Sequence, residues 1–115
     1  MKSVLSFILL FAFAAPLVLA QEPEYADAKF KVSGNCNSCK TRIEKAVKIN
    51  EVKSANWDKK TKMLSVVYQS SAISVDSLQH RIALVGHDTE KYKAADDVYA
   101  ALPACCLYRD SASAH

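Results

Sequence analysis

Glycine and proline are scarce in this sequence of 115 residues. The only two glycines, Gly34 and Gly86, are too far apart to form the glycine-rich loop that cradles a nucleotide phosphate. The three prolines are Pro16, Pro23 and Pro103, and none of them precedes a plausible central strand. A thiol–disulfide oxidoreductase would carry a cis-proline loop at such a position, so this scarcity counts against that class.

The chain also has little excess of charge of either sign. The chain has 15 lysines and arginines against 12 acidic residues, and its basic residues form no cluster with aromatic side chains. This pattern argues against a nucleic-acid-binding protein. The sequence also lacks a recognisable hydrolytic triad and a catalytic pair of carboxylates, so we expect a binding protein and not an enzyme.

The longest apolar run lies at the N-terminus. Lys2 precedes an almost entirely apolar stretch over residues 4–19, which ends in Val18-Leu19-Ala20, a sequence typical of signal-peptidase sites. We therefore expect residues 1–20 to be a signal peptide, cleaved before Gln21, and the chain to be exported, into a periplasm. The alternative is a retained anchor, but the run is short for a spanning helix. After cleavage we expect no stable membrane insertion.

The rest of the chain is predicted to hold one domain built from short strands and helices. Residues 21–27 are polar and are expected to form a flexible arm. Alternation of apolar and polar side chains predicts strands over 28–33, 52–57, 63–69 and 89–93.

Two helices are predicted between these strands. The first covers residues 38–49, with Asn37 or Ser38 as its cap, and the second covers 75–85, between a cap at Ser74 and a stop at Gly86. The resulting order β-α-β-β-α-β predicts an α+β, ferredoxin-like sandwich with both helices on one face of an antiparallel sheet.

The motif Cys36-Asn37-Ser38-Cys39 stands between the first predicted strand and the first predicted helix. One sulfur belongs to the loop and the other to the first helical turn, so both can face one ion. The partial positive charge of the helix N-terminus should lower the pKa of both thiols. Thiolates are soft ligands, and two of them suit copper(I) or mercury(II) better than hard cations. An oxidising compartment favours disulfides as the alternative.

This arrangement resembles the heavy-metal-associated domain family, which includes copper chaperones, the N-terminal domains of metal-pumping ATPases and the periplasmic mercury-binding protein. The resemblance covers residues 28–93 and rests on the Cys36–Cys39 pair, the run Ile43 to Val47, the strand at Trp57 and the loop Gly86 to Thr89. It implies that the two cysteines bind an ion near the surface, copper(I) first and mercury(II) or zinc(II) as alternatives. It also implies transfer by ligand exchange to a partner, such as a metal-transporting ATPase. Two chains could share one ion.

The sequence departs from the family pattern just before the motif. The segment Gly34-Asn35 is one residue shorter than usual and lacks the methionine that packs beneath the loop in the family. His87, in the loop after the second predicted helix, is expected to lie near the two cysteines, where a neutral imidazole could be a third ligand. The alternative for His87 is a solvent-facing loop residue.

Residues 94–109 form an extension beyond the family pattern. A short helix over 96–102 is expected to turn Val98, Ala101 and Leu102 inward. Cys105 and Cys106 follow, and three interpretations compete: further ligands for the same ion or a copper cluster, a disulfide with Cys36 or Cys39, or a structural role. We favour their participation in the metal site, and we expect residues 110–115 to be a disordered tail.

The leading function is therefore the capture of a soft metal ion, for sequestration or for transfer to a partner. The main rival is a thiol–disulfide oxidoreductase, which also uses CxxC at a helix N-terminus, although the dipeptide here is Asn-Ser rather than Gly-Pro. A third hypothesis is a structural domain with two disulfides and no metal.

Overall fold

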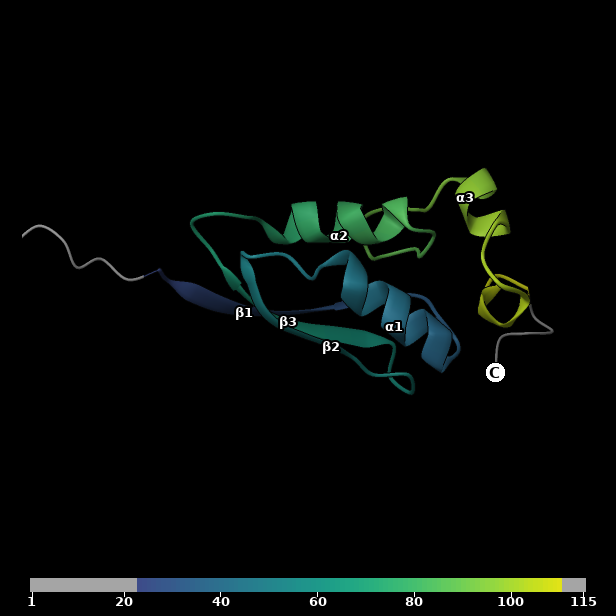
Figure 1. Cartoon of the computed structure of the whole chain (residues 1–115), viewed down its shortest axis with the longest axis horizontal. Coiled ribbons are helices and arrows are strands. Elements are labelled where there is room, and N and C mark those ends of the chain that lie inside the picture. The colour runs from purple at the N-terminus through teal and green to yellow at the C-terminus, as the bar shows by residue number, and fades with distance from the viewer. Residues whose placement is uncertain (1–22, 111–115) are drawn as a thin grey trace, which may run out of the picture.

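The computed structural model describes residues 23–110, which form a sheet covered on one face by two helices (Figure 1). Strands β1 (Tyr25–Lys31), β2 (Val52–Trp57) and β3 (Met63–Gln69) pair antiparallel in the order β1-β3-β2. Helices α1 (Asn37–Ala46) and α2 (Val75–Leu84) cover the sheet, and α3 (Asp96–Ala100) and the 3₁₀ turn η3 (Ala104–Cys106) follow. The predicted ferredoxin-like α+β fold is confirmed. The predicted signal peptide and residues 111–115 lie outside the described residues.

The core lies between the sheet and its helices. Phe30 and Trp57 flank Leu64 of the central strand, and all three are buried. Ile43 of α1 and Ile82 of α2 close the core from the helical side. None of the helices between residues 23 and 110 has the length and apolarity needed to cross a membrane.

The first strand begins earlier than the sequence predicts. Tyr25 pairs with Gln69, and the Ser70 N–H donates to the carbonyl of Glu24 at 3.1 Å, so the predicted flexible arm is wrong for residues 25–27. The physical reason is that β3 offers backbone donors and acceptors along its whole length, and these need partners. Burial alternates from Tyr25 onward, but the one inward residue between Tyr25 and Ala28 is Ala26, a small side chain that gives a weak apolar signal.

The predicted fourth strand is reduced to a single bridge between Val32 and Thr89. The Thr89 N–H donates to the carbonyl of Tyr92 at 2.8 Å, and the Thr89 hydroxyl accepts from the Tyr92 N–H at 2.9 Å. These bonds close a tight turn over residues 89–92, so the backbone that would extend the ladder is used locally.

The helices differ from the prediction mainly at their ends. The α1 N-cap is Cys36, with no side-chain cap bond, rather than Asn37 or Ser38, and the helix ends at Ala46 instead of Ile49. The predicted cap of α2 is confirmed, because the Ser74 hydroxyl accepts from the Ser77 N–H at 3.1 Å. Because the Cys36 side chain makes no capping bond, its sulfur is available to the site described below.

The C-terminal extension is part of the core. Its inward residues are Tyr99 and Leu102, whereas the predicted Ala101 is exposed. Leu102 packs onto Gly86, where a Cβ would stand 2.9 Å from its Cδ2 atom and where φ is +108°. Only glycine combines this backbone angle with so close a contact, so the end of α2 is shaped to receive the extension.

Candidate metal centre

Cys36 and Cys39 form the first part of the centre. Cys36 has an extended backbone (φ −150°, ψ 174°) at the N-cap of α1, and the Sγ atom of Cys39, one turn later, lies 3.2 Å from that of Cys36. Gly34 allows the loop to pack closely, because a Cβ there would lie 3.0 Å from the Trp57 ring and 3.1 Å from the Cys39 Cβ. The Trp57 ring therefore packs closely against Gly34, in the loop that precedes the motif. Its Nε1 atom donates to the Val32 carbonyl at 3.0 Å and fixes the ring.

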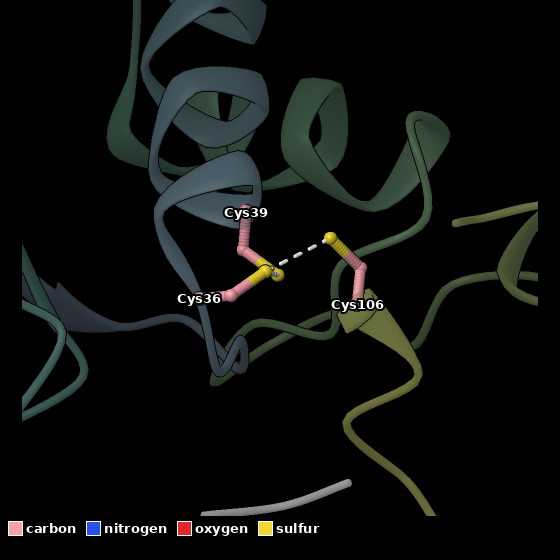
Figure 2. A group of neighbouring side chains, drawn as sticks. All are labelled: Cys36, Cys39 and Cys106. Carbon is pink, nitrogen blue, oxygen red and sulfur yellow. Dashed lines mark hydrogen bonds between the residues drawn. The ribbon is translucent and has the colours of Figure 1, made fainter. Parts of the chain in front are cut away.

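Cys106 completes a group of three sulfurs. It comes from η3, at the opposite side of the centre from α1, and points its sulfur toward the other two (Figure 2). Its Sγ atom lies 3.2 Å from that of Cys36, and all three sulfurs lie within 4.8 Å of one another. Cys39 and Cys106 are fully buried, and Cys36 is partly exposed. Such a group of sulfurs can hold a metal ion.

The negative charge of the sulfur group is concentrated on Cys106. Burial acts to raise its pKa, but hydrogen bonds from Cys39, Arg42 and Cys36 lower the pKa of Cys106 to about 6. The Arg42 Nη1 atom donates to its sulfur at 3.3 Å. Burial raises the pKa of Cys39 to about 12, so the predicted lowering of both motif thiols by the helix N-terminus is wrong for Cys39. Its desolvation outweighs the helix field.

Cys105 stands at the edge of the centre. It is exposed, and its Sγ atom lies 3.7 Å from that of Cys36 and 3.9 Å from that of Cys106. It does not belong to the group of three sulfurs. All four cysteines are free, with sulfurs well beyond the disulfide bond length of about 2.05 Å. Of the two adjacent cysteines, the structure brings Cys106 into the group.

His87 lies outside the sulfur group. Its side chain is fully buried, so it is not the solvent-facing loop residue that was the alternative. Its Nδ1 atom lies 2.8 Å from the Ser33 carbonyl, and its ring stacks on Tyr108 at 5.3 Å. Burial lowers the pKa of His87 to about 4, which keeps the imidazole neutral. Its Nε2 atom has no hydrogen-bond partner among residues 23–110.

Sequence reasoning missed the residues that hold the extension in place. Arg109 binds Asp88 through Nη2 at 2.8 Å, and the Tyr108 hydroxyl donates to the Gly86 carbonyl at 2.6 Å. Arg42, which contacts Cys106, was also missed. These contacts span from 21 to 64 positions of the sequence, and no local spacing marks them.

Comparison with known proteins gives structural matches. The CopZ metallochaperone matches with a TM-score of 0.53 and 29% identity, over 56% of this chain and 98% of that one. A copper form of CopA from Bacillus subtilis matches with a TM-score of 0.52 and 26% identity, over 63% of this chain and 100% of that one. Oxidized MerP from Ralstonia metallidurans CH34 matches with a TM-score of 0.55 and 22% identity, over 58% of this chain and 96% of that one. This match shows a likeness of fold alone. No family model and no curated protein matches the chain.

Proposed function

We propose that this chain, which belongs to the heavy-metal-associated domain family, captures a soft metal ion, copper(I) first, through the thiolates of Cys36 and Cys39. The observation that carries this proposal is the group of three sulfurs within 4.8 Å of one another. The group contains no carboxylate and no imidazole. Sulfur-only sites select copper(I), mercury(II) and related soft ions over hard cations.

Several facts favour copper(I) within the soft metals. Structural zinc sites in proteins are almost always tetrahedral with four ligands, and the group here has three sulfurs. The matches above 25% identity include the CopZ metallochaperone and the copper form of CopA. Mercury(II) is the second candidate, because it is also a soft ion that thiolates bind. Titration with both ions in competition separates the two.

The chemistry of capture is ligand exchange and not catalysis. Cys36 is partly exposed, so its sulfur can meet an incoming ion first, and the buried Cys39 then completes the pair. Each thiol releases its proton to the solvent as its metal–sulfur bond forms, because only the thiolate is a ligand. We propose that the ion is either held or passed to another metal-binding protein, such as a metal-transporting ATPase.

An anaerobic copper(I) titration against a chromogenic chelator tests the proposal. The reduced protein should take up one tightly bound ion, and Cys36→Ser and Cys39→Ser should each lower the affinity by about a hundredfold or more, since loss of one ligand removes a metal–sulfur bond. Cys105→Ser is the matched control and should bind as the unchanged protein does. Unchanged affinity in both motif variants would refute the proposal.

An insulin-reduction assay separates this function from the rival oxidoreductase. The proposal expects no reduction above that of free thiols. Turnover that depends on Cys36 would instead assign the chain to the oxidoreductases.

We propose in addition that the chain is exported, on the strength of its N-terminal sequence alone. Lys2 and the apolar run over residues 4–19 support removal of residues 1–20. Mass spectrometry of the secreted or periplasmic fraction should find a chain that begins at Gln21. A chain that keeps Met1 in the membrane fraction would show an anchor instead.

A further inference from the structure

We propose that Cys106 is a third metal ligand and that residues 94–109 act as a strap that holds this ligand over the ion. This inference rests on the proposed function and deepens it, because it names the ligand set of the same site. It assigns the chain a closed, three-thiolate site in place of an open, two-thiolate site.

The positions of the sulfurs fit a trigonal ion. With metal–sulfur bonds of about 2.3 Å, the three sulfurs of a planar trigonal site lie about 4 Å apart. The Cys36 sulfur lies 3.2 Å from each of the others, and no pair exceeds 4.8 Å. Small side-chain rotations would therefore admit the ion, without a change in the backbone. Cys106 is fully buried and faces this space (Figure 2).

The surroundings of Cys106 suit an anionic complex. Copper(I) bound to three thiolates carries a net charge of −2, which is costly to bury without compensation. Arg42 places a guanidinium nitrogen 3.3 Å from the Cys106 sulfur. The N-terminus of α1 adds the partial positive charge of its free N–H groups beside Cys36. Both positive groups come from α1, one beside the Cys106 sulfur and the other beside Cys36.

The strap is anchored close to its cysteine. The Arg109 guanidinium donates to the Asp88 carboxylate through Nη2 at 2.8 Å and through Nε at 3.2 Å. The Tyr108 hydroxyl donates to the Gly86 carbonyl at 2.6 Å and accepts from the Asp88 N–H at 2.9 Å. Because Cys106 is held in place before the ion arrives, binding orders little additional chain, and such preorganisation increases affinity.

The strap also changes what the site does with its ion. Transfer by ligand exchange needs an incoming thiolate to occupy a third position on the metal. Cys106 already fills that position from within the chain. Release to a partner therefore requires Cys106 to withdraw first, so the structure favours retention of the ion over rapid delivery.

X-ray absorption spectroscopy of the copper(I)-loaded protein tests the ligand set. We expect three sulfur neighbours per copper in the unchanged protein and in Cys105→Ser, and two in Cys106→Ser. Two sulfurs in the unchanged protein would overturn this inference and leave the proposed function standing. Absence of copper binding, or binding that survives loss of both Cys36 and Cys39, would overturn the proposed function itself. A sulfur lost in Cys105→Ser rather than Cys106→Ser would overturn the assignment to Cys106.

Release kinetics test the strap without removing a sulfur. Transfer of copper(I) to a competing chelator should be about tenfold faster, or more, in the double variant Tyr108→Phe, Arg109→Gln, because differences in affinity appear mostly in dissociation rates. Circular dichroism checks that the variant is folded. Unchanged release in a folded variant would overturn the role of the strap.

Discussion

The sulfur of Cys106 lies 3.2 Å from the sulfur of Cys36, although 70 positions separate the two residues in the sequence. The loop between β1 and α1 thus meets the end of the C-terminal extension at one point. The extension lies beside α1 (Figure 1), and Cys106 faces the other two cysteines across the centre (Figure 2).

The ion pair between Asp88 and Arg109 should stabilise the domain. Both side chains are mostly shielded from water, and Asp88 also accepts from the Ala94 N–H at 2.8 Å. Asp88→Asn should lower the free energy of unfolding in urea by about 2 kcal/mol, the usual size for hydrogen bonds to charged groups. Asp76→Asn is the control. Its carboxylate pairs with Lys91 and accepts from the Tyr92 hydroxyl at the exposed surface, so its loss should lower the stability much less. Equal losses in both variants would contradict this view of the anchor.

The buried imidazole of His87 should make the domain sensitive to mild acid. Burial lowers the pKa of His87 from 6.5 to about 4, so the unfolded chain binds a proton in the range where the folded chain does not. Stability from the neutral ring is complete above pH 6.5 and is lost as the pH falls toward 4, by up to roughly 3 kcal/mol. Denaturant titrations from pH 4 to 6, below the range in which Cys106 titrates, should show this slope, and His87→Phe should flatten it. If the stability of His87→Phe still falls with pH over this range, a group other than His87 is responsible.

The carboxylate of Glu44 should support the edge strand β2. Its Oε2 atom accepts from the Trp57 N–H at 2.8 Å as well as from Lys40 at 2.7 Å. Glu44→Ala removes the acceptor of this shielded N–H and should lower the free energy of unfolding by about 1–3 kcal/mol. Glu44→Gln keeps an acceptor oxygen and should recover most of that loss. Equal losses in the two variants would show that charge, and not the backbone bond, is what matters.

The loop before the motif should require glycine at position 34. A Cβ there would stand 3.0 Å from the Trp57 ring and 3.1 Å from the Cys39 Cβ, closer than ordinary contact. Gly34→Ala should displace Cys39, lower the free energy of unfolding by about 1–3 kcal/mol and weaken copper(I) binding. Denaturation and chelator competition measure the two effects. Ser70→Ala, in an exposed turn, is the control and should change neither. Full copper affinity in Gly34→Ala would show that the loop adapts.

Much of the fold was predictable because its signals are local. The alternation over 52–57 and 63–69 predicted β2 and β3 at their observed bounds, and Ser74 marked the start of α2. The prediction failed where tertiary contacts overrode local preference. Pairing with β3 extended β1 toward the N-terminus, and the turn at Thr89 replaced a fourth strand with one bridge.

The site was predictable in the same partial way. The spacing of Cys36 and Cys39 at the start of a helix indicated a soft-metal site without any structure. The participation of Cys106 was one of several open alternatives, because Cys105 and Cys106 are adjacent and chemically identical. Nothing in the sequence near Arg42, Tyr108 or Arg109 indicated their contacts.

The sequence by itself determined the kind of domain and the kind of chemistry, since periodicity, caps and the CxxC spacing act within a few residues of one another. Only the tertiary structure decided which further cysteine joins the pair, and that His87 stays buried outside the sulfur group. It also decided which of the thiols carries the charge. These outcomes depend on burial and on contacts between distant segments, because the free energy of a charge or a buried side chain is set by its surroundings in space.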